Sequence, residues 1–414
     1  MKNIVIKNRW LVVIGAIMIQ LALGAIYAWS VFTKILTDSH GVYGFTAKET
    51  AWVFSAGLAT FAFTMIIAGR LQAKYGPRKI AVSGGILLGL GYILGGFLGS
   101  TFLTQFLFIG IMGGGGIGLA YVVPIAVGVK WFPDKKGLIT GLSVAGFGFG
   151  ATIWVKLAGS WFGGLLNTTQ LFGLPGVQSV FVIYGFIFAL LVLLGSMIMV
   201  NPPEGYVPEG WTVNTQNSTS KNSRDYDSNQ MLKTPEFYMI WATFIFSALS
   251  GLMVIYCIRL FGVDALVYNG VENAAVLAGT AMAWYAIFNG VGRIVWGMFS
   301  DKIGRKNAIL TMTIFQSIIM FAIYHIFISA DTSSGFVIAA SIIGFNFGGN
   351  FALFPAITAD YFGNKNVGTN YGWVFSAYGI AGIVGPFIAG YFKDTAYSSG
   401  DPSVWMTPFT IAGI

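Results

Sequence analysis

Apolar residues are arranged along the chain in blocks of about 20, and short polar segments separate the blocks. About 20 apolar residues form an α-helix long enough to cross the roughly 30 Å hydrocarbon core of a bilayer. The last block reaches only Ile414, about half a membrane width, so we expect this helix to be truncated. The pattern predicts membrane-spanning helices over residues 10–33, 50–69, 80–98, 103–129, 138–160, 178–200, 236–260, 274–299, 307–329, 335–359 and 369–392, and the start of a twelfth at 403.

The composition agrees with this prediction. Charged residues make up only 9% of the chain, against roughly 25% in a typical soluble domain. The fold class is therefore an all-α membrane protein whose main partner is the lipid bilayer. The net charge of +8 lies in short loops between apolar blocks, which argues against a nucleic-acid partner. The single cysteine, Cys257, excludes an internal disulfide and a cysteine-based metal cluster.

Basic residues predict which way the helices face. With the N-terminus inside, 17 of the 23 lysines and arginines lie on the cytoplasmic side, 4 outside and 2 within helices. The positive-inside rule then places both termini in the cytoplasm, and the cell (inner) membrane is the expected location. The basic N-terminal segment leads into an apolar run of full length, so we expect a retained first helix and no cleaved signal peptide.

A polar segment divides the apolar blocks into two sets of six. Residues 201–234 are rich in Pro, Asn and Ser and are interpreted as a cytoplasmic linker. The predicted domains are an N-terminal six-helix bundle over 1–200, this linker, and a C-terminal six-helix bundle over 235–414.

The two halves repeat each other in sequence. GRLQAKYGPRK, which begins at Gly69, and GMFSDKIGRK, which begins at Gly297, follow the second and eighth predicted helices. Gly76 and Gly304 in these loops are 228 positions apart. PIAVGVKWFPDKKG and PAITADYFGNKNVG form a second pair, at offsets of 230 to 231. Two motifs at nearly one offset indicate an internal duplication.

These loops resemble the signature of the major facilitator superfamily, and the resemblance covers the whole chain. It implies two pseudo-symmetric six-helix bundles that work by alternating access, with loop contacts that hold one gating state. The first loop has Ala73 where the family usually has Asp, so gating there is expected to use other groups. The implied gating residues are Gly69, Arg70, Gly76, Arg78, Asp301, Gly304 and Arg305.

Other stretches narrow the resemblance. YAWSVF at 27–32, GIGLAYVVPIAVGVKWFPDKKGL at 116–138, MLKTPEFYMIW at 231–241, FNGVGRIVWGMFSDKIGR at 288–305, FGGNFALFPA at 347–356 and NYGWVFSAYG at 370–379 look like the oxalate:formate antiporter family. That family is related to the proton-coupled monocarboxylate transporters. Because its members carry different small acids, the resemblance leaves the substrate open.

Arg293 lies inside a predicted helix, about 12 Å along the axis from Asp301, with Asn289 one turn deeper on the same face. An arginine in a bilayer core costs several kcal/mol at least. It could reach the headgroups by snorkelling, or it could pair with an anion. No acidic residue lies in the middle of a predicted helix. A planar guanidinium suits a carboxylate, so we interpret the substrate as the missing counter-charge. The resemblance agrees, because the family's helix 8 arginine binds carboxylate and Arg293 matches it.

A count of cations narrows the substrate. In the oxalate transporter a lysine on helix 11 is a second cation, and it matches Tyr378, which is neutral at pH 7. One cation balances one carboxylate, whereas a dianion would leave charge uncompensated. The expected substrate is thus a monocarboxylate such as lactate, pyruvate, formate or acetate. The alternative is an oxalate:formate or other dicarboxylate antiporter, with Lys156 as its second cation; we expect Lys156 to snorkel near the outer rim.

The resemblance also implies an aromatic wall around the substrate, at Tyr27, Tyr121, Phe347, Phe351, Phe375 and Tyr378. Proton-coupled relatives have an aspartate at the position of Asn289, and an amide carries no proton at physiological pH. A coupled proton would need Glu272, Asp264, His325 or the substrate itself, whereas exchange of acids needs no proton site.

Other classes of protein fit less well. The linker is too short for the signalling domain of a receptor, and we find no nucleophile–base pair, metal cluster or phosphate loop in the sequence. We therefore expect a transporter and no enzyme, with no cofactor and no metal. The resemblance favours a monomer.

Overall fold

The computed structural model describes residues 8–37, 43–174, 176–208, 225–328, 333–399 and 402–414, and these residues contain helices but no β-strand. The first half holds α1 (Trp10–Leu23), η1 (Gly24–Ala28), α2 (Trp29–Leu36), α3 (Ala47–Tyr75), α4 (Pro77–Leu98), α5 (Phe102–Gln105), η2 (Phe106–Gly113), α6 (Gly114–Trp131), α7 (Lys136–Gly159), η3 (Trp161–Gly163), α8 (Leu165–Thr168) and α9 (Gly176–Ser196). The second half holds α10 (Ser228–Met231), α11 (Pro235–Tyr268), α12 (Ala274–Ile303), α13 (Arg305–Ile328), α14 (Ser333–Phe362), α15 (Val367–Ser399), η4 (Pro402–Trp405) and α16 (Met406–Gly413).

Every predicted apolar block is helical, which confirms the all-α membrane fold. Nine helical stretches of the described residues are long and apolar enough to span a bilayer. Two blocks are less regular than the apolar pattern predicts. The first is interrupted by the 3₁₀ turn η1, and the fourth by the π-helical segment η2. Local departures of this kind often mark functional positions in helices.

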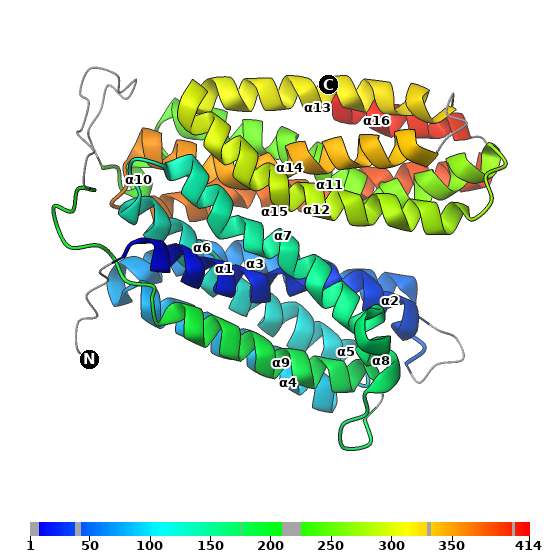
Figure 1. Cartoon of the computed structure of the whole chain (residues 1–414), viewed down its shortest axis with the longest axis horizontal. Coiled ribbons are helices and arrows are strands. Elements are labelled where there is room, and N and C mark those ends of the chain that lie inside the picture. The colour runs from blue at the N-terminus through cyan, green and yellow to red at the C-terminus, as the bar shows by residue number, and fades with distance from the viewer. Residues whose placement is uncertain (1–7, 38–42, 175, 209–224, 329–332, 400–401) are drawn as a thin grey trace.

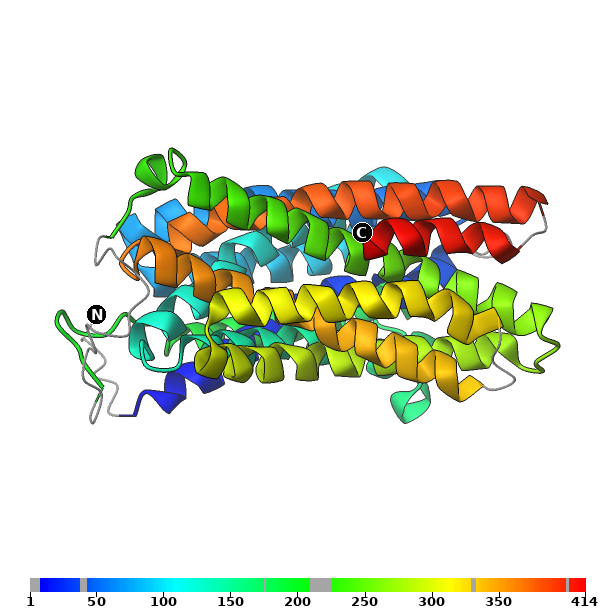
Figure 2. The same cartoon turned by 90° about the horizontal axis from the view of Figure 1, so that it is seen from above.

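The helices run side by side in two groups (Figures 1 and 2). In Figure 1, α1 to α9 form the lower group and α11 to α16 the upper one, and α1 begins at the left. The described linker residues 201–208 and 225–227 also lie at this end, which we call the linker end. Helix α7 packs on α12 and on α14, and α3 packs on α15, so these helices join the two groups.

Glycine permits this close packing. A Cβ added at Gly141 of α7 would overlap the carbonyl oxygen of Arg293, and one at Gly137 would overlap that of Gly297. A Cβ at Gly148 would lie 3.3 Å from Gly290 Cα. Small residues let helix backbones approach in a membrane, where packing rather than the hydrophobic effect holds helices together. The residue types along α7 therefore bring its main chain against α12.

The duplicated loops have the same backbone geometry. Gly76, between α3 and α4, has φ 87° and ψ 155°. Gly304, between α12 and α13, has φ 87° and ψ 154°. Glycine adopts this region readily because it lacks a Cβ, whereas other residues are strained there. This agreement supports the internal duplication.

Candidate functional site

Arg293 is completely buried, with 0% of its surface exposed. Its Nε donates to Asn289 Oδ1 at 3.1 Å, and one terminal nitrogen, Nη1, donates to the Val144 carbonyl oxygen on α7 at 2.7 Å. The guanidinium lies 4.2 Å from the centre of the Phe351 ring, close enough for a cation–π contact. In this structure Arg293 thus lies inside the protein, so it does not snorkel to the headgroups.

No carboxylate of the described residues pairs with the charge of Arg293. The ion pairs of the described residues join Arg9, Lys136 and Arg305 to aspartates, and Arg293 takes part in none of them. Its Nη2 is buried without a hydrogen-bond partner. A buried donor on a cation costs up to several kcal/mol when it lacks a hydrogen-bond partner. Native structures therefore rarely keep such a donor without a reason. The site can still bind an acceptor.

The face of α12 that carries Arg293 and Asn289 packs against the first half. The Arg293–Asn289 face packs on α7, whose glycines bring its backbone within contact distance. The Val144 carbonyl of α7 accepts the hydrogen bond from Arg293 Nη1. This carbonyl belongs to the first half and Arg293 to the second, so the contact also joins the two halves.

The predicted aromatic residues gather around this arginine from both halves. The Tyr27 and Tyr378 hydroxyls are hydrogen-bonded to each other across the interface. Phe375 stacks on Tyr378 with ring centres 5.0 Å apart and also contacts Tyr121 at 5.4 Å. The remaining pair, Phe347 and Phe351, meets edge to face at 5.4 Å, and Phe351 contacts Tyr378.

Three further aromatic residues belong to this cluster, although the sequence analysis missed them. Phe147 of α7 contacts Tyr27 and Tyr121, and its ring centre lies 5.6 Å from the Arg293 guanidinium. Tyr285 contacts Phe347 with ring centres 6.5 Å apart, Tyr371 contacts Phe375 at 5.7 Å, and both tyrosines are buried with unpartnered hydroxyls.

Helical periodicity could have found the two tyrosines. Tyr285 is eight residues, about two turns, before Arg293, and Tyr371 is seven residues before Tyr378. The hydroxyl of Tyr121 is also buried and unpartnered. Three tyrosine hydroxyls and Arg293 Nη2 are therefore free to donate hydrogen bonds to an anion.

The other predicted ionisable groups are not part of the cluster. Lys156, near the end of α7, is exposed, and so is Glu272 between α11 and α12. The side chains of Asp264 and His325 lie outside the described residues. Among the described residues, Arg293 is consequently the cation that the aromatic cluster surrounds.

The second predicted gating loop joins the halves by charge. Asp301 accepts the N–H groups of Gly137 and Leu138, at 2.9 and 2.8 Å, in the first turn of α7. A carboxylate is favourable there because a helix N-terminus carries partial positive charge. Arg305 contacts Asp301 at 2.6 Å, and Asp360 receives both Arg305 Nε at 2.9 Å and Lys136 Nζ at 2.7 Å. These contacts close the linker end between α7 and α12.

The first gating loop joins the halves with neutral contacts. The Gly69 carbonyl accepts the Thr369 hydroxyl at 2.9 Å, and a Cβ at Gly69 would overlap the backbone at Gly368. The Arg70 guanidinium lies 5.5 Å from the Trp373 ring, while Arg78 is half-buried. No ion pair of the described residues involves this loop. This agrees with the presence of Ala73 in place of an aspartate.

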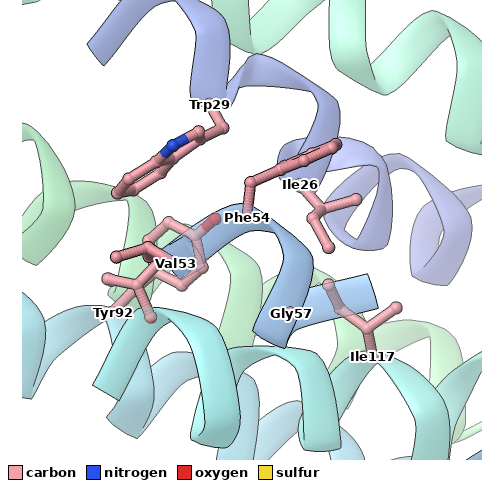
Figure 3. Close-up of a pocket in the computed structure, with 8 residues that line it drawn as sticks. Ile26, Trp29, Val53, Phe54, Gly57, Tyr92 and Ile117 are labelled. Carbon is pink, nitrogen blue, oxygen red and sulfur yellow. The ribbon is translucent and has the colours of Figure 1, made fainter. Parts of the chain in front are cut away.

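A small apolar cavity lies elsewhere, inside the first half (Figure 3). Figure 3 shows Ile26, Trp29, Val53, Phe54 and neighbouring side chains around it. Its volume of about 10 Å³ has room for at most one water molecule. It is separate from the Arg293 cluster and too small for an organic anion.

Comparisons with known proteins agree with the geometry. The model of the Major Facilitator Superfamily matches residues 9–386. The uncharacterised transporter YhjX of Escherichia coli (strain K12) is 31% identical over 91% of this chain and 86% of its own. The oxalate:formate antiporter of Oxalobacter formigenes is 26% identical over 98% and 88%. Apicoplast pyruvate carrier 1 of Toxoplasma gondii is 24% identical over 90% and 82%.

Solved structures show the same fold. The proton:xylose symporter XylE aligns with a TM-score of 0.66 at 14% identity, over 98% of this chain and 93% of its own. At this identity the likeness concerns the fold and not the substrate. Since the family model covers most of the chain, the protein belongs to the Major Facilitator Superfamily, as a multi-pass membrane transporter related to oxalate:formate antiporters and to pyruvate and monocarboxylate carriers.

Proposed function

We propose that the protein is a secondary active transporter of a small monocarboxylate, such as lactate, pyruvate or formate, by alternating access. The observation that carries this proposal is Arg293, which is buried among aromatic rings with an unpartnered Nη2 and no carboxylate partner. A substrate carboxylate would supply the missing counter-charge and accept hydrogen bonds from Nη2 and the free tyrosine hydroxyls. Asn289 holds the guanidinium in position through Nε.

The number of cations favours one carboxylate over two. Tyr378 fills the helix 11 position with a neutral hydroxyl that is bonded to Tyr27. Lys156, the other cation considered, is exposed. A dianion bound at Arg293 would leave about one charge without a partner in a low-dielectric site, and that arrangement is unfavourable.

A transport cycle follows from the closed linker end. The substrate carboxylate replaces the Val144 carbonyl at Arg293, which removes one bond between the halves. The contacts of Asp301 and Asp360 then break as α7 and α12 separate, and the site opens toward the linker. Asn289 cannot carry a proton, so we infer either exchange of acids or a proton that travels on the substrate.

Uptake into liposomes tests the proposal. Purified protein is assayed with labelled L-lactate and labelled oxalate, with and without an inward proton gradient. We expect lactate uptake that disappears in Arg293→Ala, and its increase with the gradient would indicate coupling to protons. Gradient-independent oxalate exchange would refute the charge count and favour the second candidate, an oxalate:formate type of antiporter, which the 26% identical relative supports.

We also propose that the linker end faces the cytoplasm in the cell (inner) membrane and that the protein is a monomer. The concentration of lysine and arginine in the loops of this end supports the orientation. A reporter enzyme that works only in the cytoplasm is fused at residue 215 of the linker. We expect this fusion to be active. Activity of a periplasmic reporter at that site would reverse the orientation.

A further inference from the structure

The loop between α7 and α9, residues 159–174, projects sideways from the first half. Figures 1 and 2 both show the segment around α8 standing out from the flank of the helices, at an angle to their length. The helices on either side, Lys136–Gly159 and Gly176–Ser196, are both candidate membrane spans. The loop therefore lies beside the bundle near the level where these spans meet the membrane boundary, at the end opposite the linker.

Two tight turns in this loop each present a phenylalanine. The Gly164 N–H donates to the Trp161 carbonyl at 2.9 Å, and the Leu174 N–H donates to the Leu171 carbonyl at 2.9 Å. Phe162 and Gly163 have φ of 56° and 82°, and Phe172 and Gly173 have φ of 53° and 75°. Two successive left-handed residues are typical of type I′ turns, whose first central position favours Gly, Asn or Asp. Phenylalanine is strained there.

The two strained phenylalanines are highly exposed, and the Phe172 ring contacts the Phe97 ring of α4 at 6.0 Å. Phe162 is 85% exposed and Phe172 is 82% exposed, more than any other aromatic side chain of the described residues. The second turn is held in place, because Ser179 Oγ accepts the Leu171 N–H at 2.9 Å and donates to the Leu174 carbonyl at 3.1 Å. A strained backbone that exposes two apolar rings to water would be unfavourable twice over. This combination indicates that the rings contact a partner.

Chemistry points to lipid as that partner. No charged residue occurs between Lys156 and Glu204, so the loop carries no ion that the bilayer would exclude. Trp161, beside the first turn, is 45% exposed, and tryptophan is enriched at membrane interfaces. Lys156 is exposed three residues before the loop, where its amine can meet the headgroups. Phe97 of α4, whose ring contacts Phe172, is 43% exposed and adds apolar surface beside the loop.

We propose that residues 159–174 form an interfacial anchor, whose Phe162 and Phe172 rings insert into the lipid leaflet at the end opposite the linker. The loop contains no lysine or arginine, so insertion depends on apolar contact and not on anionic lipid. The anchor is independent of the substrate proposed above. It fixes the first half relative to the bilayer.

Spin labels test the anchor. In a Cys257→Ser background, Phe162→Cys and Phe172→Cys are labelled with a nitroxide in proteoliposomes, and their collisions with oxygen and with a water-soluble nickel chelate are measured. Two matched positions calibrate the result: Gln170→Cys in the same loop, and Phe186→Cys, which is 61% exposed on the flank of α9. We expect labels at positions 162 and 172 to collide more often with oxygen than with the nickel chelate, as the label at 186 does. The label at 170 should collide mainly with the nickel chelate.

Two outcomes would overturn the proposal. Access to nickel at 162 and 172 equal to that at 170 would place the rings in water. Exclusion of both reagents would mean that a protein, such as a second copy, covers them. If the Cys257→Ser background does not fold, quenching of tryptophan fluorescence by brominated lipids is measured in the native protein instead. The fluorescence that these lipids quench should be smaller in Trp161→Phe than in the native protein. Equal results in neutral and anionic liposomes are expected.

Discussion

At the scale of single residues, the central feature is a permanent charge that neutral groups hold in place. Arg293 bonds an amide oxygen and a carbonyl oxygen and lies against an aromatic face. These contacts compensate the guanidinium only in part, because its Nη2 has no partner. A carboxylate offers a full opposite charge, which supports the proposal that an anion binds at Arg293.

Replacing this arginine tests its role. Arg293→Lys keeps the charge but loses the planar pair of donors, so we expect uptake to fall at least about tenfold, the effect of ~1.4 kcal/mol in a transport barrier or affinity. Arg293→Ala should reduce uptake to background. Uptake of labelled lactate in liposomes is the measurement, and Lys156→Ala, at an exposed position, is the control that should match the wild type. Normal uptake by Arg293→Ala would exclude the proposed site.

Tyr378 allows a second test at this scale. Tyr378→Lys introduces a second cation beside Tyr27 and close to Arg293. Two cations balance a dicarboxylate, so oxalate should compete for lactate uptake better than it does in the wild type, by roughly tenfold for ~1.4 kcal/mol of added attraction. Competition by unlabelled oxalate measures this. An unchanged ratio of oxalate to lactate affinity would show that the number of cations does not set the substrate charge.

At the scale of elements, α7 and α12 meet along glycines that leave no room for a side chain. This pair carries both Arg293 and the Asp301 cap, so the closed linker end and the site share one helix interface. The other interface, between α3 and α15, relies on Gly69 and Thr369. The two repeats thus share loop geometry but close by different chemistry.

A methyl group tests the α7–α12 contact. In Gly141→Ala the new Cβ overlaps the Arg293 carbonyl, so the helices must separate, at a cost of about 1–3 kcal/mol to the closed state. Thr140 faces α14, where its hydroxyl donates to the Ala352 carbonyl. We expect a thiol reagent to label Thr140→Cys faster when Gly141→Ala is also present than when it is absent. Gly279→Ala, on α12 with no atom within 4 Å of its Cβ, should have no effect. Equal labelling rates in both variants would contradict a tight α7–α12 closure.

At the scale of the whole molecule, hydrogen bonds and ion pairs from one half to the other hold the linker end closed. They include the Arg293 bond to Val144, the Asp301 cap and the Asp360 ion pairs. When the halves rock apart without substrate, Arg293 loses the carbonyl and gains nothing. Movement with a bound carboxylate avoids that loss, because the substrate stays with the arginine.

This difference predicts exchange faster than net transport. Liposomes preloaded with unlabelled substrate should take up label roughly ten- to hundredfold faster than empty liposomes, since the loss of one hydrogen bond to a charged group, ~1.5–3 kcal/mol, slows the return of the empty carrier. Initial rates of the two preparations give the comparison. Equal rates would mean that the Arg293–Val144 contact does not limit the return step.

The amino-acid sequence by itself determined the helices, the duplication and the position of the buried charge. An apolar block long enough to cross the bilayer predicts a helix by itself, because a helix satisfies its own backbone hydrogen bonds without help from neighbouring segments. The (i, i+4) spacing likewise fixed the Asn289–Arg293 pair, which the structure shows at 3.1 Å. Local rules of this kind do not depend on where the other helices lie.

Only the tertiary structure decided which groups from distant helices meet Arg293. The Val144 carbonyl and Phe147 carry no signal that separates them from many other residues of a chain with 16% aromatics. Helical periodicity places Tyr285 and Tyr371 on the faces of Arg293 and Tyr378, but it does not say which side chains of other helices they meet. The closed linker end and the sideways loop of residues 159–174 also depend on packing between segments far apart in sequence. The physical reason is that helix periodicity defines a face, whereas the partner of that face is set by close contact between helices.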